Sequence, residues 1–320
     1  MPSLLIPRLS EQTALFGTLD LSSYADLFLQ GVLCAQFAHY MNANEHDSAW
    51  MKLFVAGLAL LTTVKSVQIL AIEWMQNADL FESLEALSKL WFAQWISRLT
   101  LPLEAIIAFY VQMFFCHRLW VLSHNKHIVV TAIILFVLAL AAACVATYFF
   151  PDEYLSAVWV SVHLGFAVGG DIIQTGGIVF YLLHHSKTLI RRGPTASMIS
   201  SLLWLTIQSA APGALCELSN FSTTVSTLPA HAVAANKLSP GLAAAAFTNL
   251  VLSKIYAVSA MWTLNSREEI RTAAANVPPT HLDLPTSGLV WADEGNTGDF
   301  QRSQSEAKNT QTTPPETGDI

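Results

Sequence analysis

Six ionisable side chains lie inside long apolar stretches of this 320-residue chain, where a charge is poorly solvated. They are Asp26, Lys65, Arg98, Glu104, Asp171 and Lys254. Three are acidic and three are basic, so their charges sum to zero, which predicts pairing inside a polar core. Such groups either brace helices through salt bridges or line a cavity that binds a ligand or relays an ion. Both interpretations stay open on the sequence.

The six charges are predicted to form two layers, counted from the presumed outer end of each helix. At a rise of about 1.5 Å per residue, the shallower layer is about 9–16 Å deep and contains Asp26, Lys65 and Arg98. The deeper layer is about 18–23 Å deep and contains Glu104, Asp171 and Lys254. Each layer holds both signs, and Asp171 with Lys254 is the pair whose substitution would test this arrangement.

Lys254 raises the question of a retinal Schiff base, with Glu104 as its counter-ion. Microbial rhodopsins place an aspartate four residues before that lysine, whereas position 250 here is leucine. We therefore predict no cofactor. The four cysteines lie in or beside apolar segments without close spacing, which predicts neither a disulfide framework nor a metal site.

The sequence lacks the motifs of the familiar catalytic classes. It contains no glycine-rich phosphate loop, no nucleophile elbow and no zinc-protease motif, and its loops are too short for a catalytic domain. It also has no block of basic residues of the kind that binds nucleic acid. These features predict that the protein is not an enzyme and has no nucleic-acid partner.

The composition indicates which elements must position the charges. Of the residues, 53% are hydrophobic and only 12% are charged, whereas soluble domains carry about 25% charged residues. Each apolar stretch approaches the roughly 20 residues that cross a bilayer as a helix. The predicted segments are 15–40, 50–74, 91–118, 128–150, 157–183, 196–218 and 239–264. The predicted fold is an all-α polytopic membrane protein with a seven-transmembrane-helix bundle over 15–264.

Basic residues set the predicted orientation. They gather in the breaks at 119–127 and 184–195 and at the start of the tail, while the alternate breaks hold few of them. By the positive-inside rule, residues 1–14 are external and the C-terminus is cytosolic. Residues 265–320 are polar and rich in proline, which predicts a disordered tail. The expected partner is a lipid bilayer, with the plasma membrane favoured.

Three local features add predictions of their own. Asn220 opens an Asn-Phe-Ser glycosylation sequon in the last predicted external loop. Gly165 and Gly169 are four residues apart, a spacing that lets helices pack closely inside one bundle or between two copies of the chain. Pro102 and Pro212 predict kinks in the third and sixth segments.

Four stretches carry a resemblance to a known family. They are Gly31, Gln36 and Tyr40 in the first segment, Val111 to Arg118 in the third, Asp171 to Leu183 in the fifth, and Ser253 to Arg267 in the seventh. Together they resemble a fungal, basidiomycete-type family of seven-helix membrane proteins defined by domain of unknown function 6534. The resemblance covers most of 15–270, with the named domain at about 157–270. It implies a multi-pass membrane protein without an established activity.

Three classes of function fit the sequence. A receptor-like sensor for a small-molecule ligand is favoured, because seven helices, an external N-terminus, short loops and a Ser/Thr-bearing tail suit it. One alternative is a transporter of a small solute or an ion, for which the charge layers would form the pathway. The other is a structural or interaction protein of the membrane that needs no ligand.

Overall fold

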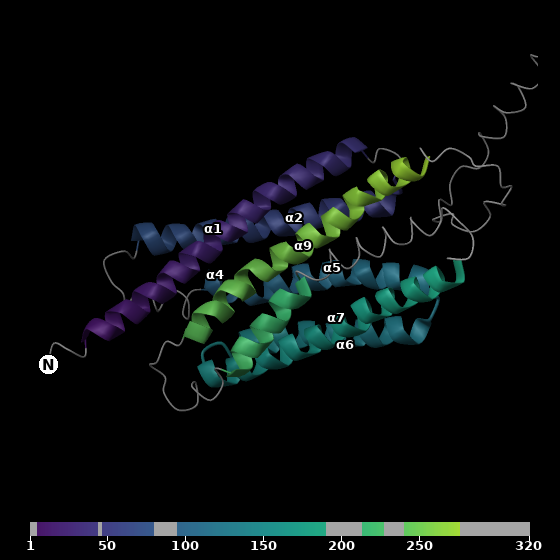
Figure 1. Ribbon diagram of the computed structural model, residues 1–320. Helices are drawn as coiled ribbons and strands as arrows, with labels where there is room; N and C mark the ends of the chain where they lie inside the picture. The colour runs from purple at the N-terminus through teal and green to yellow at the C-terminus, as the bar shows by residue number, and fades with distance from the viewer. Residues whose placement is uncertain (1–4, 44–46, 80–94, 190–212, 227–239, 276–320) are drawn as a thin grey trace, which may run out of the picture. The chain divides into compact units, whose positions relative to one another are not determined.

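The described part of the chain is helical apart from short turns (Figure 1). The structure, a computed structural model, describes residues 5–43, 47–79, 95–189, 213–226 and 240–275, all within one compact unit over 1–277. Its elements are α1 (Leu5–Ala43), α2 (Ala49–Trp74), the π-helical turn η1 (Met75–Asp79), α4 (Trp95–Arg98), α5 (Thr100–Ser123), α6 (Lys126–Tyr148), α7 (Glu153–Leu189), a helix over 213–226, and α9 (Pro240–Ala275). The prediction of an all-α fold is confirmed.

The ends of the helices differ from the predicted segments at several points. Helical hydrogen bonds run through Leu99, so Trp95–Ser123 is one helix with a one-residue irregularity at Leu99 between α4 and α5. Pro102 has no N–H to donate to the carbonyl oxygen of Arg98, so the irregularity lies where the proline is predicted to bend the helix. Helix α9 continues to Ala275, so the residues after 264 begin as helix. Most of the predicted segment 196–218, with its kink at Pro212, and most of the predicted tail lie outside the described residues.

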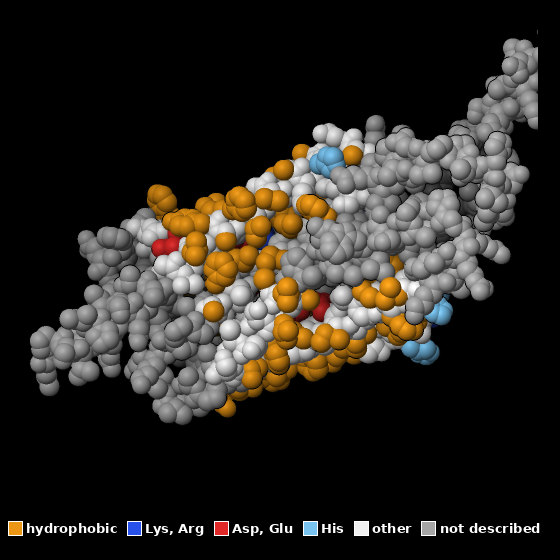
Figure 2. Space-filling model, viewed as in Figure 1, with side chains coloured by type: hydrophobic (Ala, Val, Ile, Leu, Met, Phe, Trp, Pro, Cys, Tyr) orange, Lys and Arg blue, Asp and Glu red, His pale blue; other side chains and the backbone are white. Residues whose placement is uncertain are grey.

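Four helices in the described part of the chain are long and apolar enough to cross a membrane. They are Ala49–Asn77, Trp95–Ser123, Lys126–Tyr148 and Tyr154–His184. Helices α1 and α9 are long enough but carry more polar residues, and the two pack against each other. Figure 2 shows hydrophobic side chains along the described helices on the face turned to the viewer. Four apolar helices of this kind suit a lipid environment.

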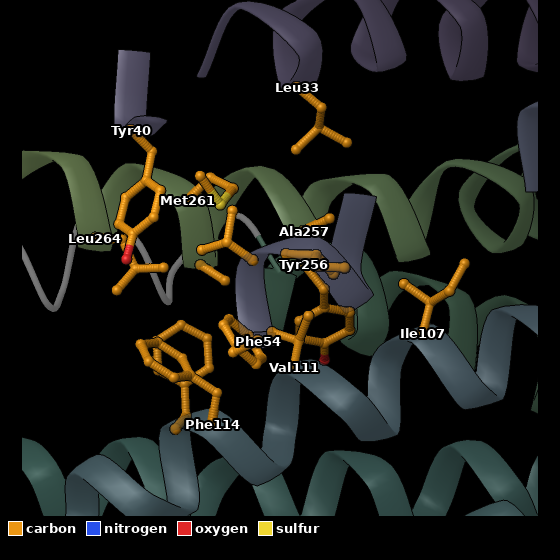
Figure 3. Close-up of a cluster of buried hydrophobic side chains, with 14 of the residues drawn as sticks. Leu33, Tyr40, Phe54, Ile107, Val111, Phe114, Tyr256, Ala257, Met261 and Leu264 are labelled. Atoms are coloured by element: carbon orange, nitrogen blue, oxygen red, sulfur yellow. The ribbon is translucent and has the colours of Figure 1, made fainter. Parts of the chain in front are cut away.

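Helix α5 organises the packing, since it contacts α2, α6, α7 and α9. One hydrophobic core cluster joins α1, α2, α5 and α9 and includes Leu33, Phe54, Val111 and Met261 (Figure 3). A second cluster joins α5, α6 and α7. The polar residues described below lie between and beside these clusters, on the inward faces of the same helices.

Helix α7 packs closely against α6 at Gly170. A Cβ atom at Gly170 would collide with the ring of Phe136 on α6. A Cβ at Gly165 or Gly169 would instead meet its nearest side chain at 3.4 Å or 3.9 Å, which are ordinary contact distances. The close approach inside the bundle therefore lies one residue beyond the predicted pair. A contact between two copies of the chain through Gly165 and Gly169 stays a prediction.

This packing gives a matched pair of substitutions. Gly170→Ala should lower the free energy of unfolding by about 1–3 kcal/mol, because the added methyl group overpacks the contact with Phe136. Gly169→Ala gains the same helix propensity without a collision, so its effect should be neutral or stabilising by up to about 1 kcal/mol. Titration with a denaturing detergent, followed by tryptophan fluorescence, measures both. Equal stabilities for the two variants would contradict this packing.

Candidate functional site

The side chain of Lys254 on α9 is fully buried and is held in a polar cage built by α1 and α2. Its ammonium group donates to Gln30 Oε1 at 2.6 Å, to the carbonyl oxygen of Thr62 at 2.7 Å and to Ser66 Oγ at 2.7 Å. The Asp26 carboxylate lies 3.6 Å from the same nitrogen, and Ser66 Oγ donates to it at 3.0 Å. All three ammonium protons are therefore used, and the opposite charge stands directly beside them.

The second ion pair joins α2 to α5. Lys65 Nζ lies 2.7 Å from Glu104 Oε1, and both side chains are buried. The other carboxylate oxygen of Glu104 accepts from Asn249 Nδ2 at 2.8 Å. Asn249 in turn accepts from Asn220 Nδ2 at 3.0 Å through its own side-chain oxygen. This chain of contacts connects α2, α5, α9 and helix 213–226.

A third cluster contains two carboxyl groups and a tyrosine. The Tyr256 hydroxyl of α9 lies within hydrogen-bond distance of Asp171 Oδ2 on α7 and 2.7 Å from Glu217 Oε2 on helix 213–226. Gln112 Nε2 of α5 donates to Asp171 Oδ1 at 3.3 Å. No lysine or arginine among the described residues forms an ion pair with either carboxyl group.

The structure thus pairs the predicted charges differently from the two-layer scheme. Lys65 pairs with Glu104 and Lys254 with Asp26, so each ion pair joins the two predicted layers. The suggested pair of Asp171 with Lys254 is not formed, since Asp171 contacts Tyr256 and Gln112 instead. The sixth predicted residue, Arg98, is half-buried at the end of α4, next to the irregularity at Leu99.

Sequence reasoning missed Glu217 and the uncharged partners. Glu217 is next to the predicted end of the sixth segment, where a carboxylate would be solvated, but helix 213–226 continues beyond it and leaves it 2% exposed. Its place within an apolar run was the available signal. Asn249, Ser66 and Tyr256 gave no such signal, because uncharged polar residues are common in membrane helices and only contacts distinguish them.

Asn220, the predicted glycosylation residue, lies in helix 213–226 rather than in a loop. Its side chain is buried, and the amide nitrogen that would carry a glycan donates to Asn249. A glycan on that nitrogen would have to be accommodated at a buried contact between two helices, and glycosylation of Asn220 stays a prediction.

A small cavity lies between Glu104 of the second ion pair and Glu217 of the third cluster. Its volume is about 20 Å³, enough for a single water molecule and far below the roughly 300 Å³ of a small-molecule site. Its polar lining comes from Glu104 and Gln112 of α5, His163 of α7, Glu217 of helix 213–226, and Asn249 and Ser253 of α9. Within the described residues, no group of three or more His, Cys, Asp or Glu side chains could hold a metal ion.

The last part of α9 contacts the end of α1 and Asp47, which follows α1. Arg267 Nη2 lies 3.2 Å from the Asp47 carboxylate, and the Tyr40 hydroxyl donates to the same group at 2.9 Å. Asn265 Nδ2 donates to the Gln36 carbonyl oxygen at 3.1 Å. Helix α9 therefore contacts α1 both at the buried cage and near its own end.

In the part of the chain that the structure describes, these features define a helical protein with a charged, buried interior and four helices that can cross a membrane. Residues 167–269 match a family of unknown function (DUF6534), which confirms the predicted resemblance to that domain. Asp171, Glu217 and Tyr256 all lie within the match, whereas Asp26, Lys65 and Glu104 lie outside it. No curated protein and no solved structure matches the chain.

Proposed function

We propose that this protein is a non-enzymatic, seven-helix membrane protein that acts as a receptor-like sensor. In this proposal α1, α9 and the segment ending in helix 213–226 complete the bundle with the four apolar helices. The N-terminus is external and the C-terminus is cytosolic, which the distribution of basic residues supports, and the plasma membrane is the favoured location.

The observation that carries the proposal is the continuity of α9. This single helix holds Asn249, Lys254 and Tyr256, one member of each buried polar cluster. The same helix reaches Arg267, whose contact with Asp47 lies where the predicted cytosolic tail begins. A change in any cluster would therefore act on one stiff element that leads toward the tail. Sensors need such a link between the membrane interior and the cytosol.

An ion carrier is the second candidate, and the cavity between Glu104 and Glu217 is the observation that favours it. A volume of about 20 Å³ has room for a single water molecule, which supports a proton as the transported ion more than a small organic solute. A purely structural role is supported by the closed ion pairs of Lys65 and Lys254. The experiment below separates these three.

The test measures whether the buried network controls the end of α9. Spin labels at His127 on α6 and Ser266 on α9, in a cysteine-free full chain in lipid nanodiscs, report the distance between these elements. Asn249→Ala and Asp26→Asn should change the distance distribution, because each removes a contact of α9 or of its Lys254 cage. Leu60→Ala, at an exposed apolar position on α2, is the matched control and should leave it unchanged.

Identical distributions in all variants would contradict the sensor and favour a structural brace. Proton or cation flux in proteoliposomes, lost in the Asn249 variant, would favour the carrier. Tags at the two termini give the orientation, and two tags on the same side of the membrane would contradict an odd number of spans.

A further inference from the structure

The Tyr256 hydroxyl lies between two buried carboxyl groups, those of Asp171 and Glu217. A phenol has one proton and can donate it to only one of them. The second close contact therefore requires a proton on a carboxyl group. Two ionised carboxylates that share one hydroxyl group would also repel each other strongly, because little water is present to screen their charges. No basic side chain among the described residues forms an ion pair with either of them.

The groups around this cluster do not supply the missing positive charge. On α5, Gln112 donates an amide proton to Asp171, and the Cys116 thiol donates to Gln174 of α7. His163 of α7 contacts the Ala139 carbonyl oxygen at 2.8 Å, so its Nδ1 proton is engaged there. Glu104, across the cavity, is neutralised by Lys65. Of the described neighbours, none balances the second carboxylate.

A second observation points to a ligand in the adjoining cavity. Ser253 Oγ is 1% exposed, lines the cavity together with Glu217 and Glu104, and has no hydrogen-bond partner among the described residues. A buried hydroxyl without a partner is uncommon, because burying it without a hydrogen bond costs about 1–3 kcal/mol. The volume of about 20 Å³ and the polar lining suit one water molecule.

We propose that Asp171, Tyr256 and Glu217 form a buried site that binds one exchangeable proton, and that a single water molecule held by Ser253 connects this site to Glu104. On release, the O–H bond of the Glu217 carboxyl breaks and the water accepts the proton, passing one of its own protons to the Glu104 carboxylate. Release leaves two ionised carboxylates on α7 and helix 213–226. Their repulsion acts between two helices that Tyr256 of α9 otherwise holds together.

Infrared spectroscopy of the full chain in lipid membranes tests the site directly. The wild type should show the C=O stretch of a protonated carboxyl group, shifted in D₂O and lost in alkaline buffer. Glu217→Gln and Asp171→Asn, two nearly isosteric changes, should each abolish that band. Asp152→Asn, at an exposed position between α6 and α7, is the control and should keep it. Ser253→Ala should keep the band but slow its shift in D₂O several-fold.

Absence of the band in the wild type, or its persistence in both carboxyl variants, would overturn the proposal. A bound cation would overturn it in another way. In that case sodium chloride, compared with choline chloride at equal ionic strength, would raise the melting temperature in alkaline buffer, and Glu217→Gln would abolish the effect. Normal tryptophan fluorescence and gel filtration of at least one carboxyl variant ensure that loss of the band is not loss of folding.

Discussion

Lys254→Met should lower the free energy of unfolding by about 3–5 kcal/mol, because it leaves the buried Asp26 carboxylate without its counter-charge. The substitution also removes the ammonium group that donates to Gln30, Thr62 and Ser66. Their acceptor oxygens then stay buried or half-buried without this hydrogen bond. Methionine fills a similar volume, so the loss reports the charge and its hydrogen bonds rather than a cavity.

The double variant Asp26→Asn/Lys254→Met should recover a large part of that loss, since no unpaired charge remains. Lys52→Met, on the same helix as the cage but exposed, is the matched control and should change stability by less than about 1 kcal/mol. Denaturing-detergent titrations of the wild type, Asp26→Asn, Lys254→Met and the double variant measure the coupling, and Lys52→Met is titrated beside them. A double variant as unstable as the sum of its single changes would show that Asp26 and Lys254 do not interact.

Hydropathy alone locates α2 and α6, because each is one apolar run with polar residues at both ends. The predictions 50–74 and 128–150 compare with Ala49–Trp74 and Lys126–Tyr148. Helices α1 and α9 are harder to assign as spans. Polar side chains of α9 contact α1, since Lys254 donates to the Gln30 side chain and Asn265 to the backbone carbonyl oxygen of Gln36, and the composition of one helix does not show what its neighbour buries.

Charges inside apolar runs could be recognised from the sequence, but their partners could not. Depth was counted from predicted helix ends, and α2 continues as a π-helical turn to Asp79, five residues beyond its predicted end. Lys65 therefore lies further from that end than the count assumed, at the level of Glu104. The burial of Glu217 escapes prediction for the same reason, since its helix extends past the predicted boundary at 218. Register between helices depends on side-chain packing, which hydropathy does not contain.

Lys65→Met is the second substitution with a large expected effect, again about 3–5 kcal/mol, because Glu104 would remain buried and charged. Glu104 differs from Asp26 in one respect: its second oxygen accepts a hydrogen bond from Asn249, which connects it to helix 213–226. Restoring neutrality at position 104 therefore does not by itself restore the site. The partner of Asn249 must be kept as well.

Two double variants separate these contributions. Lys65→Met/Glu104→Gln keeps an amide oxygen for Asn249, whereas Lys65→Met/Glu104→Met removes every acceptor at that position. The first should be more stable than the second by about 1–3 kcal/mol, the cost of a buried amide without its partner. Denaturing-detergent titration of the two proteins measures the difference. Equal stabilities would contradict a stabilising hydrogen bond between Asn249 and the acceptor at position 104. The expected difference would show that this one hydrogen bond joins α5 to α9 independently of the charge on Glu104.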